Sequence, residues 1–168
     1  VNPAIENKMQ FQVPSSVEVS TDNGSTWSAL SISSNDLKDL VSGTGTGGGI
    51  TISNQSYTQL RLTWNFSDYN YGYVFLNYLH YYTSPKRNTI APTIEARDFA
   101  SQTFSTIESG DAHSGWPTHI WMPHNAVPFL SSSGRNDVVR ITWDLSWNTS
   151  YTDSIEITKL NWYGTYPV

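Results

Sequence analysis

Cysteine is absent from the sequence, and this absence excludes three kinds of chemistry at once. The chain has no disulfide framework, no cysteine-ligated zinc and no thiol nucleophile. Charged residues are scarce as well, at 14% of the 168 positions, against about 25% in an average soluble domain. The stability of such a chain must come from packing, sheet pairing or oligomerisation.

Positive charge is the scarcer of the two signs. Nine Lys and Arg stand against 14 Asp and Glu, which gives a formal net charge of −5. Nucleic-acid affinity comes mainly from clustered Lys and Arg, and here these residues are scattered along the chain. No apolar run approaches the roughly 18 residues of a membrane-spanning helix. We therefore expect no nucleic-acid partner and no membrane insertion.

Aromatic residues are what the chain has in excess, with ten Tyr, seven Trp and six Phe. Disordered segments combine high charge with few aromatics, so this composition indicates a folded chain. A length of 168 residues suits one domain with a substantial core. We expect residues 1–16 to form a linker or shaft-proximal segment and residues 17–168 to form the domain.

Short apolar segments alternate with stretches of Gly, Asn, Asp, Ser and Pro. In residues 57–66 and again in 137–147, apolar and polar side chains alternate strictly, which predicts strands buried on one face. Residues 73–83 are apolar or aromatic on both faces and predict a central strand. Within 154–164 the apolar phase shifts, which predicts a β-bulge near Thr158-Lys159.

Two local motifs complete the fold prediction. The turn Asp22-Asn23-Gly24-Ser25 predicts a tight hairpin, because Asn-Gly tolerates positive φ. Ser34-Asn35-Asp36 offers a helix N-cap ahead of an apolar stripe formed by Leu37, Leu40 and Val41. Some ten short strands and this one helix predict an all-β fold, a two-sheet antiparallel β-sandwich that is jelly-roll-like, with a closed barrel as the alternative.

The histidines, carboxylates and serines of the sequence form no recognisable catalytic or metal-binding motif. The three histidines between positions 113 and 124 match no zinc-binding spacing. The carboxylate pairs Glu95 with Asp98 and Asp144 with Glu156 lie in predicted strands, where a charge facing solvent is common. No Gly-x-Ser-x-Gly elbow is present. We expect no enzymatic activity and no cofactor.

Calcium is the one ion that the loops could suit. The turns at residues 22–24 and 68–70 carry the hard oxygen ligands that Ca²⁺ prefers. Turn formation accounts for the same Asp and Asn residues without an ion. A bound Ca²⁺ therefore stays a minor alternative.

A second set of aromatic residues falls in predicted loops rather than in strands. Flat rings beside Asn, Asp and Ser suit a sugar, whose C–H face stacks while its hydroxyls form hydrogen bonds. Core packing or a subunit contact would use the same rings. The candidate receptor- or glycan-binding residues are Tyr69, Tyr71, Trp116, His119, Trp121 and His124.

Four segments of the sequence carry a more specific likeness. They are residues 20–28 before the short Leu-Lys-Asp-Leu helix, residues 114–129 with their Trp-Pro, Pro-His-Asn and Pro-Phe motifs, residues 139–143, and the ending 160–167. From about residue 17 to 167 the chain resembles the distal domains of tail fibres of tailed bacteriophages, of the marine and cyanobacterial type.

The resemblance implies an extracellular virion protein, placed on a tail fibre, that attaches to a receptor on the host cell. That receptor is often a surface glycan, bound without covalent chemistry, and the assembly is a homotrimer. An excess of aromatics with few charges also suits a subunit interface. Two alternatives remain: a carbohydrate-binding module of a larger glycoside hydrolase, and a structural virion decoration or adaptor domain without a ligand.

Overall fold

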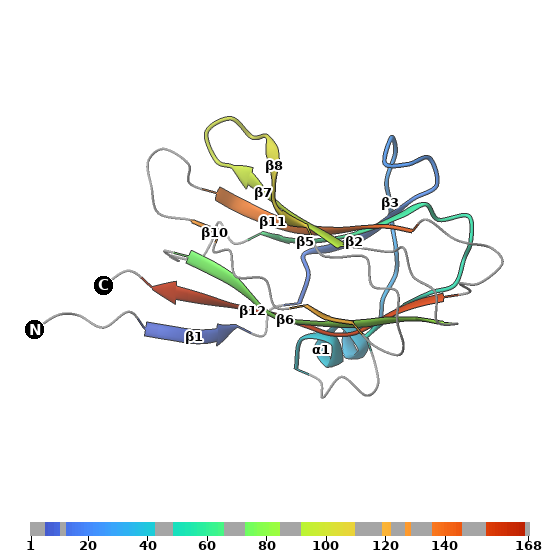
Figure 1. Ribbon diagram of the computed structural model, residues 1–168, viewed down its shortest axis with the longest axis horizontal. Helices are drawn as coiled ribbons and strands as arrows, with labels where there is room; N and C mark the ends of the chain where they lie inside the picture. Colours follow the sequence, from blue (N-terminus) through green and yellow to red (C-terminus); the bar gives the residue numbers. More distant parts are fainter. Residues whose placement is uncertain are drawn as a thin grey trace, which may run out of the picture.

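The structure is a computed structural model of the chain, and its described parts form two antiparallel sheets and one short helix (Figure 1). The two sheets lie face to face, which confirms the predicted all-β sandwich. The described residues are 6–10, 13–42, 49–65, 73–84, 92–109, 119–121, 127–128, 136–145 and 154–166.

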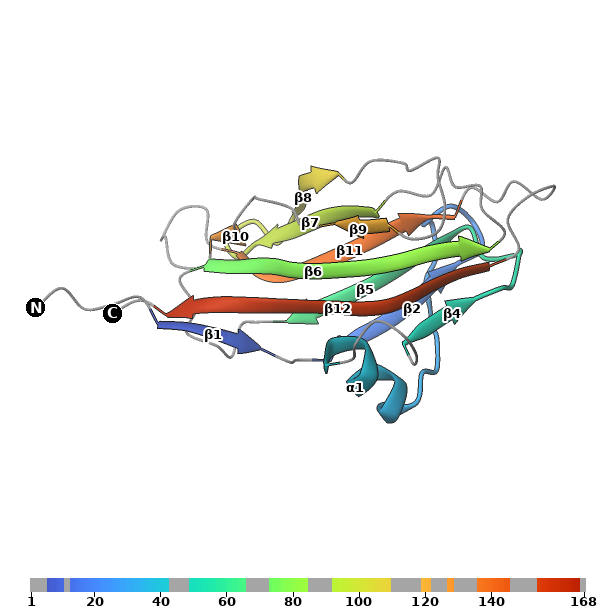
Figure 2. The same cartoon turned by 60° about the horizontal axis from the view of Figure 1, so that its bottom comes forward.

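Sheet A is built around two long neighbouring strands, β12 and β6. One edge of β12 pairs with β1 and β4, and the far edge of β6 pairs with β9 and β10 (Figure 2). The short strands at 119–121 and 127–128 thus lie at the sheet edge, as expected of a segment rich in proline. The strands of sheet A are β1 (Glu6–Gln10), β4 (Ile50–Ile52), β6 (Tyr73–Ser84), β9 (His119–Trp121), β10 (Val127–Pro128) and β12 (Ser154–Tyr166).

Sheet B has the strand order β3-β2-β5-β11-β7-β8. From β4 to β7, and again from β10 to β12, each successive strand lies in the other sheet, so the connections cross repeatedly between the layers in a jelly-roll-like manner. The strands of sheet B are β2 (Ser16–Ser20), β3 (Ser28–Ala29), β5 (Gln59–Asn65), β7 (Pro92–Asp98), β8 (Phe104–Ser109) and β11 (Asn136–Asp144).

The core lies between the sheets and follows the alternation in the sequence. On β5 the side chains of Leu60, Leu62 and Trp64 are buried, and β11 supplies a matching buried row that includes Ile141 and Trp143. Both predicted one-sided strands are thereby confirmed in their described parts. Their opposite faces are turned away from the core and carry the polar residues of the alternation.

The β12 strand contains the predicted bulge. Its register with β6 shifts between Ile157 and Lys159, and again between Asn161 and Trp162. A bulge lets a strand change which side chains face the core, so both Ile157 and Leu160 are buried. The phase shift read from the sequence is confirmed as a true irregularity of this strand.

Helix α1 (Ser34–Ser42) covers the outer face of sheet A (Figure 1). Leu40 and Val41 are buried, and the buried Asn161 of β12 donates a hydrogen bond from Nδ2 to the Val41 carbonyl at 3.2 Å. The cap differs by one position from the prediction. Ser33 is the cap, because its Oγ accepts the Asp36 backbone N–H at 3.1 Å and donates to the Asp36 carboxylate at 2.6 Å.

Strand β1 lies inside the segment 1–16 that was expected to be a linker or shaft-proximal segment. Glu6 to Gln10 pair in register with Tyr166 to Trp162 of β12, so this stretch adds an edge strand to sheet A. Within the described residues, no helix is long and apolar enough to cross a membrane.

Candidate binding pocket

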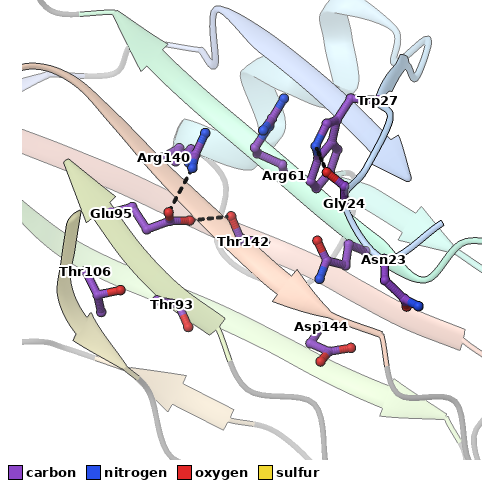
Figure 3. A pocket seen from close by; sticks show the side chains of 11 residues that line it. Asn23, Gly24, Trp27, Arg61, Thr93, Glu95, Thr106, Arg140, Thr142 and Asp144 are labelled. Atoms are coloured by element: carbon purple, nitrogen blue, oxygen red, sulfur yellow. Dashed lines mark hydrogen bonds and ion pairs between the residues drawn. The ribbon is translucent and has the colours of Figure 1, made fainter. Parts of the chain in front are cut away.

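A polar pocket lies on the face of sheet B that points away from the core (Figure 3). Its volume is about 430 Å³. The β2–β3 and β7–β8 hairpins both project beyond sheet B on this side (Figure 1). The lining residues are Asn23, Gly24, Trp27, Gln59, Arg61, Thr93, Glu95, Thr106, Arg140, Thr142 and Asp144.

Strand register brings the lining residues together from distant parts of the sequence. Arg61 of β5 stands opposite Thr142 of β11, and Thr142 stands opposite Thr93 of β7. In the next row across the sheet, Arg140 stands opposite Glu95. Because side chains alternate along a strand, the same pattern that buries the core residues presents these polar groups outward.

The turn between β2 and β3 is held by one carboxylate. Asp22 accepts hydrogen bonds from Ser20 Oγ at 2.7 Å, from the Thr26 backbone N–H at 2.8 Å and from Thr26 Oγ1 at 2.6 Å. These bonds, above all those from Thr26, lower the pKa of Asp22 to about 2. Asn23 and Gly24 have φ values of 56° and 87°, the left-handed geometry predicted for this hairpin.

The same turn positions Trp27 at the rim of the pocket. Its Nε1–H donates to the Gly24 carbonyl at 3.1 Å. The guanidinium of Arg61 lies over the indole ring, 3.9 Å from the ring centroid. Arg61 in turn donates from Nε and Nη2 to Glu18 Oε1 at 3.3 and 3.0 Å. Trp27 is therefore fixed by its own turn and by the sheet beneath it.

A second arginine is arranged in a similar way. Arg140 donates from Nη2 to Glu95 Oε2 at 2.8 Å, and Thr142 Oγ1 donates to Glu95 Oε1 at 3.0 Å (Figure 3). The Arg140 guanidinium lies 3.6 Å from the centroid of the Phe104 ring. Both pocket arginines thus have an aromatic ring on one face and a glutamate at the edge.

The chemistry of the pocket is that of hydrogen bonding and stacking. Hydroxyl groups of Thr93 and Thr106 and the amides of Asn23 and Gln59 line it together with the indole of Trp27. The carboxylates that the sequence suggested as pairs are not brought together: Glu95 and Asp144 line the pocket, Asp98 accepts the Ser101 N–H in the β7–β8 turn, and Glu156 lies in sheet A.

Metal binding finds no support in the described part of the chain. No group of three or more His, Asp or Glu side chains there could hold an ion. The oxygens of Asp22, which were considered for Ca²⁺, accept hydrogen bonds from Ser20 and Thr26.

The residues predicted to bind a receptor fall outside this pocket or outside the described residues. Tyr69, Tyr71, Trp116 and His124 belong to segments that the structure does not describe. The backbones of His119 and Trp121 pair with Tyr81 and Leu79 at the edge of sheet A, in the other layer of the sandwich. Their role in binding stays a prediction.

Sequence reasoning missed the pocket, although one signal was available. Trp27 follows the Asn23-Gly24 turn by three residues, so it had to lie beside the hairpin. Its partner Arg61 and the threonines across the sheet depend on strand register, which the sequence leaves open.

Comparison with known proteins adds no relative. No protein-family model, no curated protein and no solved structure matches the chain.

Proposed function

We propose that this domain is a non-catalytic attachment module that binds a surface glycan in the pocket on sheet B. The observation that carries the proposal is a fixed indole, Trp27, beside the polar groups of Asn23, Thr93 and Thr106. A sugar ring presents an apolar face to an aromatic ring and hydroxyls to amides and threonines.

Preorganisation makes such a site effective. Ordering a side chain on binding costs about 0.5–1.5 kcal/mol for each flexible group. Trp27 is already held by the Gly24 carbonyl and by Arg61, so a ligand meets a ring that is in place. The threonines are short and stand on paired strands, which fixes them as well. Little conformational freedom is lost when a glycan enters.

The biological role that we propose for the domain follows from its resemblance to phage tail fibres. The domain would form the tip of a tail fibre of a tailed bacteriophage and attach the virion to a glycan on the host cell. A single pocket of this size binds weakly, and three copies in a homotrimer would raise the overall affinity through avidity.

A glycan array tests the proposal directly. The wild-type domain is applied to an array that includes bacterial lipopolysaccharides and capsular polysaccharides, and the bound signal is compared with that of Trp27→Ala. We expect the variant to bind at least ten-fold more weakly, because the stacking surface is lost. Phe99→Ala is the matched control, since Phe99 is 51% exposed and lies outside the pocket lining. Wild-type protein that binds no glycan, or a Trp27→Ala variant that binds as well as wild type, would contradict the proposal.

A second candidate is the carbohydrate-binding module of a glycoside hydrolase. It is favoured by the chemistry of the pocket, in which the Trp27 indole stands beside amide and threonine groups, as such a module requires. Sedimentation equilibrium separates the two. A trimer at micromolar concentration supports the fibre tip, and a monomer at millimolar concentration supports the module.

A further inference from the structure

The two arginines of the pocket are each paired with a glutamate of the protein. Arg61 forms an ion pair with Glu18 at 3.0 Å, and Arg140 forms one with Glu95 at 2.8 Å. Each pair is largely shielded, with side-chain exposures of 17% and 27% for the first and 20% for both members of the second. Neither arginine offers an uncompensated positive charge to a ligand.

The hydrogen bonds and ring contacts of the guanidinium groups also make the arginines poor binding sites for an anion. Proteins recognise carboxylate, sulfate and phosphate by offering two parallel N–H groups of an arginine to two oxygens. On Arg61 the Nε and Nη2 groups both donate to Glu18 Oε1. Trp27 occupies one face of this guanidinium, as Phe104 does for Arg140. At Arg61, an anionic ligand would have to displace Glu18 before it could bind to these two N–H groups.

The remaining groups of the pocket are neutral or acidic. Thr93, Thr106 and Asn23 supply hydroxyl and amide groups, and Asp144 is an acidic member of the lining. The whole chain also carries a formal net charge of −5. Anionic sugars are therefore repelled at the pocket and at longer range.

We infer that the ligand of this pocket is an uncharged glycan, selected against glycans that carry carboxylate, sulfate or phosphate groups. This inference rests on the proposed function and narrows it to one chemical class. The ion pairs then serve to hold Arg61 against the ring of Trp27 and Arg140 against the ring of Phe104. The amides of Asn23 and Gln59 and the hydroxyls of Thr93 and Thr106 then bind the hydroxyl groups of the glycan.

Neutral and acidic polysaccharides, including pairs that share a backbone and differ in their charged groups, test the inference. Binding of the wild-type domain is measured on an array that carries neutral and acidic bacterial polysaccharides, dextran with dextran sulfate, and methyl-esterified with de-esterified pectin. We expect the signal on neutral glycans to exceed that on acidic ones at least ten-fold. The signal on neutral glycans should change less than two-fold between 50 and 500 mM NaCl. A preference for acidic glycans that weakens with salt would overturn the inference and leave glycan binding standing; no binding to any glycan would overturn the proposed function itself.

Exposing one arginine provides a second test that does not depend on loss of folding. Glu18→Gln removes the negative charge that compensates Arg61, so we expect the ratio of acidic to neutral glycan binding to rise at least five-fold at 50 mM NaCl. Asp39→Asn is the control, because it makes the same change in net charge on helix α1, which packs on sheet A. An equal rise in both variants, or no rise in Glu18→Gln, would overturn the inference.

Discussion

The indole ring of Trp64 meets that of Trp162 edge to face, with 5.6 Å between the ring centroids and an interplanar angle of 67°. Trp64 belongs to β5 of sheet B and Trp162 to β12 of sheet A, so this contact joins the two layers. Both side chains are almost fully buried. Aromatic pairs of this geometry add about 0.5–1.5 kcal/mol to the energy of burial alone. Tyr81 and Trp143 form a second such contact between the sheets, at 6.3 Å.

Removal of one ring should weaken the sandwich strongly. We expect Trp162→Ala to lower the free energy of unfolding by about 3–5 kcal/mol, because it leaves a large cavity between the sheets. Trp162→Phe keeps a ring in place and should lose less. Urea unfolding followed by far-UV circular dichroism measures both, with the exposed Phe99→Ala as a control expected within about 0.5 kcal/mol of wild type. A loss under about 1 kcal/mol for Trp162→Ala would show that the pair does not hold the layers together.

Acid should weaken the β2–β3 turn through Asp22. The pKa of this carboxyl is lowered from 3.8 to about 2 in the folded chain by its hydrogen bonds to Thr26 and Ser20. Between these two values the unfolded chain binds more protons than the folded one, so stability falls as the pH falls. We expect the stability difference between wild type and Asp22→Asn to be full above pH 4 and to shrink towards pH 2.

Urea unfolding at several pH values between 2 and 6 measures that difference. Asp22→Asn should remove only part of the acid dependence, because the pKa of Asp137 is also lowered, by the hydrogen bonds that Arg97 donates to it at 3.0 and 2.7 Å. Identical pH profiles for wild type and variant would contradict a role for the Asp22 carboxylate in the folded turn.

Features that depend on neighbouring residues in the sequence could be predicted, whereas features that depend on the pairing of distant strands could not. The burial of Leu62 and Ile141 follows from a period of two residues, which is local, and it was predicted. The β12 bulge was predicted for the same reason. The pocket is different, because Arg61, Thr142 and Thr93 meet only through the pairing of three strands. Alternation tells which face each side chain takes and leaves open which residues stand opposite.

The aromatic residues of the predicted loops show a second limit of prediction from sequence. Their composition suggested a glycan site at residues such as Trp116, and that prediction stays untested because the segment lies outside the described residues. Trp27 was counted only as part of a motif in the resemblance. Its role became visible through Arg61, whose guanidinium lies over the indole ring.

Two glycines with positive φ should respond differently to the same substitution. Gly49 and Gly24 have φ values of 89° and 87°, so alanine is strained at both positions. At Gly49 a Cβ would also overlap the carbonyl oxygen of Ile157, a backbone atom of β12 that pairing with β4 and β6 holds in place. At Gly24 it would meet Gln59 Oε1 at 2.7 Å, the end of a flexible side chain that can move aside.

We therefore expect Gly24→Ala to cost about 1 kcal/mol, the strain alone, and Gly49→Ala to cost about 3 kcal/mol, because strand pairing must also shift. Urea unfolding of the two variants side by side measures the difference, and each serves as the control for the other. Equal losses would show that backbone strain alone decides both sites. A greater loss at Gly24 would mean that the hairpin beside the pocket, rather than the junction of β4 with β12, is the less adaptable part of the fold.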